Sequence, residues 1–286
     1  MDPVLITGAN RGIGRSIALQ IAARGAPVLL LCRDARGAAA VAGEVEAAGG
    51  QARAVLADLA DPEQVDRAVA ELRRDTPRLG ALVLNAGLWP DRLERDSRGL
   101  ERSFVVNHLA PFQLVAGLWP LLAESRARIV CVSAGLYVFG RRDLDAVARG
   151  TAFSRWRTYC DTKRCNAVFA RELARRAAGT SVTVNAVHPG VINTGLGEGS
   201  GLERGLVRLW KRLLRSPEQG ALGPVALAVD PMYHDVTGQY FNELKPEPWR
   251  AETGGDAEAQ ALWEQSEALV GRRFEVRAGE GASSTP

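Results

Sequence analysis

The chain of 286 residues has few of the side chains that bind metals or form disulfides. It contains four cysteines and three histidines, and no two cysteines are spaced as a C-x-x-C pair. We therefore expect no metal site. We expect free thiols, as in a reducing compartment, at Cys32, Cys131, Cys160 and Cys165.

An excess of charge of one sign and long hydrophobic runs are also missing. The 36 Lys and Arg residues and 33 Asp and Glu residues leave a net charge of +3, too balanced to indicate a nucleic-acid-binding protein. No apolar run is predicted to span a bilayer, so we expect no integral membrane segment. The apolar run Val4–Ile6 starts so early that no signal peptide is expected before it, and the cytoplasm is the predicted location.

What the chain does have is the composition of a globular protein, with 46% hydrophobic and 24% charged residues. Its length allows one large α/β domain or two small ones. We predict one domain over residues 1–277, with a lid over the substrate at about 195–216 and a flexible tail at 278–286. The stretch Leu202–Arg215 reads as an amphipathic helix within that lid.

Short apolar runs alternate with helical apolar spacing along the chain. The predicted strands are Val4–Ile6, Pro27–Cys32, Ala52–Ala57, Ala81–Asn85, Ala127–Val132, Ser181–Val187 and Gly238–Phe241. The predicted helices include Ser16–Ala22, Ala35–Ala48, Glu63–Arg74, Gly99–Ala123, Arg155–Ala178 and Ala257–Val270. This alternation predicts an α/β fold, a single-domain Rossmann-type doubly wound parallel sheet with helices on both faces.

The first strand runs into the glycine-rich segment Thr7-Gly8-Ala9-Asn10-Arg11-Gly12-Ile13-Gly14, and a helix follows. Glycine permits a tight turn and the close approach of backbone to a phosphate, while the helix N-terminus offers free N–H groups. The spacing and context predict a dinucleotide-binding turn. The alternative is an ordinary glycine-rich turn between a strand and a helix.

A second pattern is Tyr159 four residues before Lys163 on a predicted helix, which puts a phenol and an ammonium on one face. We expect Lys163 to lower the pKa of Tyr159 and suit it to exchange protons with a substrate oxygen. Ser133 follows a strand at the carboxyl edge, where ligands bind in such sheets. Asn107 is an amide within an apolar run, either functional or a satisfied buried residue.

These residues resemble the short-chain dehydrogenase/reductase family over about residues 3–245. Thr7–Gly14 is similar to the family's cofactor turn. Asp58-Leu59 is similar to the pair that contacts the adenine, and Asn85-Ala86-Gly87 to the segment that supports the sheet beside the cofactor. Pro189-Gly190, Val191 and Thr194 are similar to the segment that holds the nicotinamide carboxamide.

Asn107, Ser133, Tyr159 and Lys163 match the family's catalytic tetrad in order. The resemblance implies that Tyr159 is the general acid/base, that Ser133 polarises the substrate oxygen, and that Lys163 binds the nicotinamide ribose and tunes Tyr159. It implies that Asn107 positions a water linking Lys163 to solvent. The cofactor would supply the hydride chemistry and the protein the orientation and electrostatics.

The end of the second strand bears on the choice of nicotinamide. NAD-preferring sites place a carboxylate there, but this chain has Cys32 followed by Arg33, and arginine suits a 2′-phosphate. Arg11 in the glycine turn adds a second cation. Both favour NADPH/NADP. NAD stays open as the alternative if Asp34 binds the ribose instead.

The chain resembles the retinol-dehydrogenase branch of the family in particular. Ser133 and Tyr159 are 26 positions apart, with the insert Leu136–Trp156 between them, and His188-Pro189-Gly190 is similar to that branch. Tyr159–Asn166 also resembles the active-site helix of light-dependent protochlorophyllide reductase, which leaves a C=C reductase as an alternative.

The predicted activity is the NADPH-dependent reduction of a ketone or aldehyde on a bulky apolar small molecule, reversibly an alcohol oxidation. A non-catalytic NADP-sensing or scaffold protein of the same fold is the competing function. The intact tetrad favours the enzyme, because a sensor needs no proton relay. The protein is expected to be a homodimer, or a monomer if the insert Leu136–Trp156 covers the dimer surface.

Overall fold

The computed structural model describes residues 1–191, 215–250 and 253–276. Their core is one eight-stranded sheet with the order β3-β2-β1-β4-β5-β6-β7-β8. The strands are β1 Val4–Thr7, β2 Val28–Cys32, β3 Ala52–Leu56, β4 Ala81–Leu84, β5 Arg128–Val132, β6 Thr183–His188, β7 Tyr240–Asn242 and β8 Lys245–Glu247. β1 to β7 are parallel, and β8 is antiparallel to β7.

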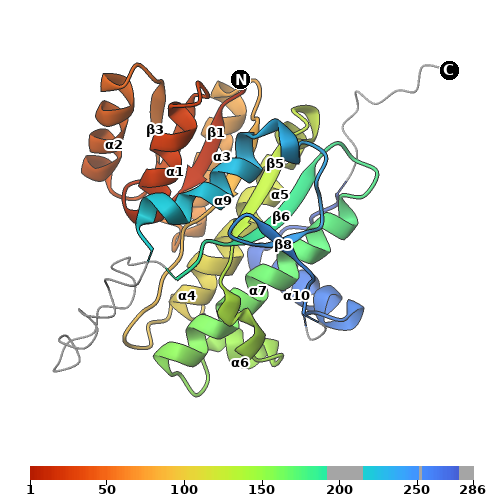
Figure 1. Cartoon of the computed structure of the whole chain (residues 1–286). Helices are drawn as coiled ribbons and strands as arrows, with labels where there is room; N and C mark the ends of the chain where they lie inside the picture. The colour runs from red at the N-terminus through yellow and green to blue at the C-terminus, as the bar shows by residue number, and fades with distance from the viewer. Residues whose placement is uncertain (192–214, 251–252, 277–286) are drawn as a thin grey trace.

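Helices cover both faces of this sheet (Figure 1). The longer helices are α1 Gly12–Ala22, α2 Ala35–Ala47, α3 Pro62–Asp75, α5 Ala110–Glu124, α7 Arg155–Arg176, α9 Pro217–Val229 and α10 Asp256–Val270. Strand β1 shows why two layers form. Val4 and Ile6 pack with α1, α2 and α9, whereas Leu5 packs with α3, α5 and α7. A strand buried on both faces is apolar throughout.

The predicted fold class is confirmed, and most predicted strands and helices are present within a few residues. Two elements at the C-terminal side differ. Gly238–Phe241 was expected to be the last strand, but β7 begins at Tyr240 and the antiparallel β8 follows it. Helix α9 was not expected, because its Gly220, Gly223 and Pro224 have poor helix propensity.

The helix expected over Gly99–Ala123 is interrupted. It consists of α4 Arg102–Phe104, the π-helical turn η1 Val105–Leu109 and then α5. By length and composition, Arg102–Glu124 could span a membrane, so the expectation that no apolar run is long enough was wrong in that respect. Within the fold 89% of its most apolar window is buried, as in a core helix.

The insert Leu136–Trp156 folds against α7. It contains the 3₁₀ turn η2 Gly135–Phe139 and the short helix α6 Leu144–Arg149. Arg141 ties it down, because its backbone N–H donates to Asp161 Oδ1 at 2.7 Å and its guanidinium to Asp161 Oδ2 at 2.8 Å. The Asp161 side chain is almost fully buried, so this ion pair anchors the insert two residues from Tyr159.

The strand order reverses between β1 and β4, and a ligand crevice forms at the carboxyl ends of strands beside such a reversal. The glycine turn follows β1 there, and Asn85-Ala86-Gly87 follows β4. β5, with Ser133 after its end, is the next strand along the sheet. The fold thus gathers the predicted segments at one edge.

Candidate active site

The glycine turn between β1 and α1 has a backbone conformation and a close packing that favour glycine. Gly8 and Gly12 have φ of +67° and +55°, in the left-handed region. A Cβ on Gly14 would be 2.1 Å from the Gly8 carbonyl oxygen and 2.6 Å from Asn85 Nδ2. Arg11 precedes α1 without a side-chain cap, so the first N–H groups of the helix have no side-chain partner from it. This turn fits a dinucleotide pyrophosphate.

Hydrogen bonds between Thr7 and the Asn85-Ala86 segment hold the glycine turn in place. The Thr7 hydroxyl accepts hydrogen bonds from the N–H groups of Asn85 and Ala86, both at 2.9 Å, and Asn85 Nδ2 donates to the Thr7 carbonyl at 2.9 Å. Thr7 is only 1% exposed. These bonds join the ends of β1 and β4, so Thr7 and Asn85 shape the crevice through the backbone rather than by presenting side chains to a ligand.

The end of β2 carries the groups that bear on the nucleotide. The Arg33 side chain is 55% exposed, with Nη1 3.7 Å from Asp58 Oδ2. Asp34 is the N-cap of α2 and its Oδ1 accepts a hydrogen bond from Arg36 N–H at 3.1 Å. The carboxylate proposed to bind the ribose in the NAD alternative is therefore partly engaged in capping, whereas Arg33 projects freely enough to meet a phosphate.

The other residues predicted to contact the nucleotide lie near the ends of β1, β2 and β3. A Cβ on Gly37 would be 3.0 Å from Asn10 Cβ, which places Asn10 against the start of α2. Ile13 packs on the core beneath α1. Asp58 Oδ1 accepts from Ala60 N–H at 2.9 Å, and the adjacent Leu59 is buried.

Asn107 lies in the π-helical turn η1 and its side chain is fully engaged. Its Oδ1 accepts from Leu88 N–H at 2.6 Å, and its Nδ2 donates to the Leu88 carbonyl and to Thr162 Oγ1, both at 3.0 Å. The amide therefore joins the loop after β4 to α7. π turns inside helices are frequent at functional sites. The amide's bonds explain why a polar residue sits in an apolar run.

Unlike the Asn107 side chain, the Ser133 side chain is without hydrogen bonds to the described residues. Its N–H donates to the Val187 carbonyl at 2.8 Å, which fixes the backbone beyond the end of β5. Its hydroxyl is buried and has no hydrogen-bond partner among the residues that the structure describes. A buried polar atom without a partner costs free energy unless a ligand or water satisfies it. Ser133 therefore marks a place where a ligand is expected.

Tyr159 and Lys163 lie one turn apart in α7, next to this position. Lys163 Nζ is 5.8 Å from the centroid of the Tyr159 ring and donates to the carbonyl of Val132, the residue before Ser133, at 3.1 Å. A Cβ on Gly87 would be 3.6 Å from Lys163 Nζ and 3.7 Å from Asn107 Oδ1. The structure thus brings the N-A-G segment, Asn107 and Lys163 together beside the β5 end.

The electrostatics differ from the prediction in one respect. Burial lowers the pKa of Lys163 to about 8, and burial together with the neighbouring Cys160 raises the pKa of Tyr159 to about 12. The expectation that Lys163 brings the pKa of Tyr159 below its ordinary value is therefore wrong. The physical reason is that both groups are desolvated, and the penalty on the phenolate exceeds any gain from the ammonium.

The segment after β6 is only partly described. Gly190 has a φ of +86°, and Val191 is exposed at the edge of the site. The Val191 carbonyl accepts from the Arg215 N–H at 3.0 Å. Thr194, nearly all of the lid at about 195–216, the helix predicted over Leu202–Arg215 except its last residue, and the tail at 278–286 lie outside the described residues.

Two features of the site were given no role from the sequence. Trp89, two residues after Gly87, lies flat on the Tyr159 ring with 4.3 Å between centroids and 13° between planes. His188, at the end of β6, has a buried Nδ1 without a partner and a pKa lowered by burial and then by Lys163. The position of Trp89 just past N-A-G was the only sequence signal for the first, and His188 was noted from the sequence only as part of His188-Pro189-Gly190.

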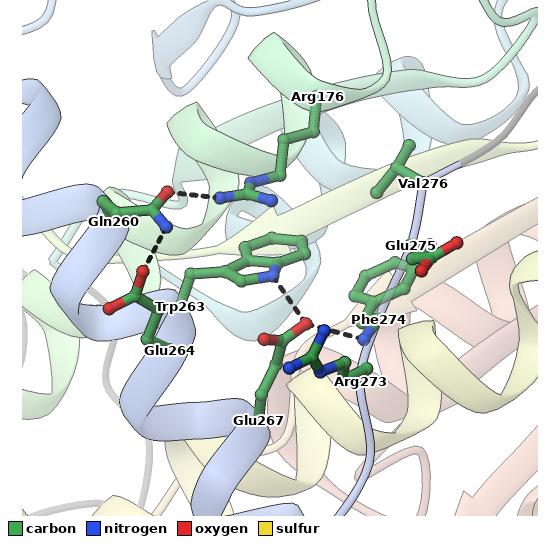
Figure 2. A pocket seen from close by; sticks show the side chains of 9 residues that line it. All are labelled: Arg176, Gln260, Trp263, Glu264, Glu267, Arg273, Phe274, Glu275 and Val276. Carbon is green, nitrogen blue, oxygen red and sulfur yellow. Dashed lines mark hydrogen bonds between the residues drawn. The ribbon is translucent and has the colours of Figure 1, made fainter.

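A surface hollow of about 510 Å³ lies elsewhere, where the C-terminal segment crosses α10 (Figure 2). At its centre Trp263 is covered by the Arg176 guanidinium, 4.2 Å from the ring centroid. Arg176 ends α7, about 25 Å along the helix from Tyr159. The side chains of the hollow pair with one another, and it is separate from the site at the strand ends. In the parts of the chain that the structure describes, no cluster of His, Cys, Asp and Glu could hold a metal.

A glycine turn beside the strand-order reversal, with a buried serine and a Tyr-x-x-x-Lys pair at the same sheet edge, defines the class of protein as a Rossmann-type α/β oxidoreductase. A short chain dehydrogenase family model matches residues 2–204, more than half of the chain. The chain belongs to the short-chain dehydrogenase/reductase family, in its retinol-dehydrogenase-like branch.

Individual relatives agree with this assignment. The chain is 36% identical to mouse (Mus musculus) retinol dehydrogenase 14 over 94% of its own length and 85% of the relative's. It is similar to a solved protein of Mycobacterium paratuberculosis, with a TM-score of 0.76, 26% identity and coverage of 96% and 95% of the two chains. It is also similar to a metagenomic blue fluorescent protein solved with NADPH, with a TM-score of 0.67, 28% identity and coverage of 85% and 96%.

Proposed function

We propose that this oxidoreductase uses NADPH to reduce a ketone or aldehyde on a bulky apolar small molecule, and that it oxidises the corresponding alcohol in reverse. The observation that carries the proposal is the buried, unpartnered Ser133 hydroxyl next to Lys163 and Tyr159, at the end of the sheet that holds the glycine turn. A substrate oxygen is the partner that this hydroxyl lacks.

Each residue of the catalytic group has its own proposed role. Tyr159 holds a proton at its phenol oxygen and gives it to the substrate oxygen, which Ser133 orients by a hydrogen bond. Lys163, fixed by the Val132 carbonyl, stabilises the phenolate left on Tyr159 and binds the nicotinamide ribose. The nicotinamide, when bound, supplies the hydride that the substrate carbon accepts.

The proton that Tyr159 loses must be replaced from solvent, and Asn107 is proposed to hold the water for this relay. Its side-chain amide is already bonded to Leu88 and Thr162, so the backbone carbonyl is the group of Asn107 proposed to hold the water. Pro111, four residues on, has no N–H to donate to that carbonyl as a helix would require. The π turn and the proline together support this role for the carbonyl.

NADPH is proposed over NADH because of Arg33. Its exposed guanidinium at the end of β2 and Arg11 in the glycine turn suit a 2′-phosphate, whereas Asp34 caps α2. A structural neighbour was solved with NADPH, which supports the same choice. The proposed location is the cytoplasm, since the four cysteines are buried free thiols. Fractionation of the native host would test that location, and recovery in the membrane pellet would contradict it.

The deciding experiment mixes the purified protein with NADPH and a panel of aryl ketones and long-chain aldehydes. We expect cofactor oxidation with at least one carbonyl and slower oxidation of NADH. Tyr159→Phe should lower kcat by about 10²- to 10⁴-fold while NADPH binding stays within about twofold, because only the proton donor is lost. Tight NADPH binding without any turnover would favour the sensor alternative, and an active Tyr159→Phe variant would contradict the assigned acid.

A further inference from the structure

The contact between Trp89 and Tyr159 is not used by any role proposed above. The indole lies in the loop after β4, and its ring is nearly parallel to the phenol, with 4.3 Å between centroids. That separation and the 13° tilt describe a stacked pair, an arrangement that aromatic rings favour beyond the area they bury. One face of Tyr159 is therefore covered by an apolar ring.

Trp89 is held in place by contacts that do not involve Tyr159. Its Nε1 donates to the Arg155 carbonyl at 2.9 Å, and the Arg155 guanidinium carbon lies 5.4 Å from the indole centroid. Arg155 Nη1 also pairs with Asp91 Oδ1, on the same loop as Trp89, at 2.9 Å. Three contacts thus join the loop to the first turn of α7, so the indole forms a preset wall beside the phenol.

Two consequences follow for the phenol. A stacked ring restricts rotation of Tyr159 about χ2 and so fixes the plane of the phenol, in which its O–H bond prefers to lie. The indole also keeps water from one face of the ring, and desolvation disfavours a phenolate. Burial is the largest cause of the raised pKa of Tyr159, ahead of the neighbouring Cys160.

Other charged or titratable groups surround this pair. Lys163 lies on the same helix, and burial with the smaller effect of Cys131 from β5 sets its own pKa. His188 from β6 lies within the electrostatic reach of Lys163. Arg155 and Asp91 flank Trp89 on its other side. None of these groups stacks on the Tyr159 ring. Among the described residues, Trp89 is the stacked partner.

We propose that Trp89 is a positioning residue for Tyr159, which fixes the plane of the phenol and excludes water from one of its faces. The inference rests on the proposed function, in which Tyr159 is the acid. In carbonyl reduction the Tyr159 O–H bond breaks and its proton goes to the substrate oxygen, while the electron pair arrives with the hydride of the bound NADPH.

The first test titrates Tyr159 in the free protein by the ultraviolet absorbance of tyrosinate, with the matching Tyr159→Phe protein subtracted to remove the other three tyrosines. Trp89→Ala should lower the pKa of Tyr159 by about one pH unit or more, because water reaches the ring. Trp89→Phe keeps a stacked ring and should stay near the parent. Thermal melting and NADPH binding check that each variant is folded.

Trp156→Ala is the matched control. Its indole lies 6.2 Å from that of Trp89 at 51°, is 51% exposed, and has no described ring contact with Tyr159. We expect no change in the Tyr159 titration on its removal. A shift as large for Trp156→Ala as for Trp89→Ala, or equal shifts for Trp89→Phe and Trp89→Ala, would overturn the proposal.

The second test is the pH profile of alcohol oxidation, in which Tyr159 must first be a phenolate. The midpoint of kcat should move to lower pH in Trp89→Ala. A raised KM with an unmoved midpoint would mean that Trp89 only lines the pocket, and would overturn the inference. The absorbance titration needs no turnover, so it tests Trp89 even if the proposed reductase activity is absent.

Discussion

The two strand ends that meet at this site are built by different means. At the ends of β1 and β2, the crevice is made by backbone, with glycines where an added Cβ would collide and with charges such as Arg33 exposed to solvent. Around β5 and α7, the site is made of buried side chains. Burial shifts the pKa values of His108, Cys131, Tyr159 and Lys163 there.

The difference explains what each end is suited to do. A phosphate needs N–H groups and room for close approach, which a glycine turn provides without any buried charge. Proton transfer needs groups whose protonation is set by their surroundings, which requires burial. The first end should therefore be sensitive to added volume and insensitive to pH, and the second end the reverse.

The largest expected effect comes from adding one methyl group to the glycine turn. In Gly14→Ala the new Cβ would meet the Gly8 carbonyl oxygen at 2.1 Å, so the turn must open. We expect NADPH affinity to fall at least a hundredfold, about 3 kcal/mol, as measured by calorimetry or fluorescence titration.

Gly43→Ala is the control for that substitution. Gly43 lies in α2, and an added Cβ there has no atom within 4 Å. It should leave NADPH binding unchanged and raise the stability by about 0.5–1 kcal/mol, since alanine is the better helix former. Equal NADPH affinity in Gly14→Ala and Gly43→Ala would show that the turn does not bind the cofactor through its backbone.

The same contrast decides how much could be predicted from the sequence. The cofactor end depends on spacing: Thr7–Gly14 between a strand and a helix was identified from the sequence and is present. These signals are local. A glycine at a fixed offset or a cap residue acts within a few positions of its own place in the chain.

The parts that could not be predicted depend on contacts between distant segments. The direction of the Tyr159 pKa shift follows from burial in the fold, and Trp89, which stacks on its ring, is 70 positions away in the sequence. Helix α9 was missed because Gly223 breaks the propensity pattern, yet it lets the helix approach Val187 and the Glu243 carbonyl closely. Its Ser216–Gln219 capping box was the available signal.

The second prediction concerns pH at the buried end. His108 is 1% exposed, its Nε2 is 2.8 Å from Ser266 Oγ, and burial lowers its pKa to about 3. His108 in the unfolded chain binds a proton at about pH 6.5, whereas His108 in the folded protein stays neutral at that pH. The free energy of unfolding is therefore highest above about pH 6.5 and falls as the pH is lowered towards 3. We expect a loss of about 2 kcal/mol between about pH 6.5 and pH 5, measured by urea unfolding.

His108→Gln should flatten this dependence, because an amide can reach Ser266 as Nε2 does but binds no proton. His234→Gln should leave it unchanged, since the His234 side chain is 67% exposed. If the slope of stability against pH is the same in His108→Gln as in the parent, the acid sensitivity arises elsewhere and the contrast between the two ends is weaker than the structure indicates.

The smallest expected effect belongs to the exposed charge at the cofactor end. Arg33 is 55% exposed and lies 3.7 Å from Asp58, so its attraction to a 2′-phosphate is screened by solvent. Arg33→Glu should weaken NADPH binding about tenfold and improve NADH binding by less, a change of about 1.4 kcal/mol that shrinks as salt is added.

Asp34→Asn is the matched variant on the next residue. It should cost some helix stability through the cap of α2 but should not weaken NADH binding, because the proposal gives Asp34 no contact with the ribose. NADPH affinity that is unchanged in Arg33→Glu, together with NADH affinity that falls in Asp34→Asn, would reverse the cofactor assignment and would place the nucleotide's recognition on the carboxylate instead of the arginine.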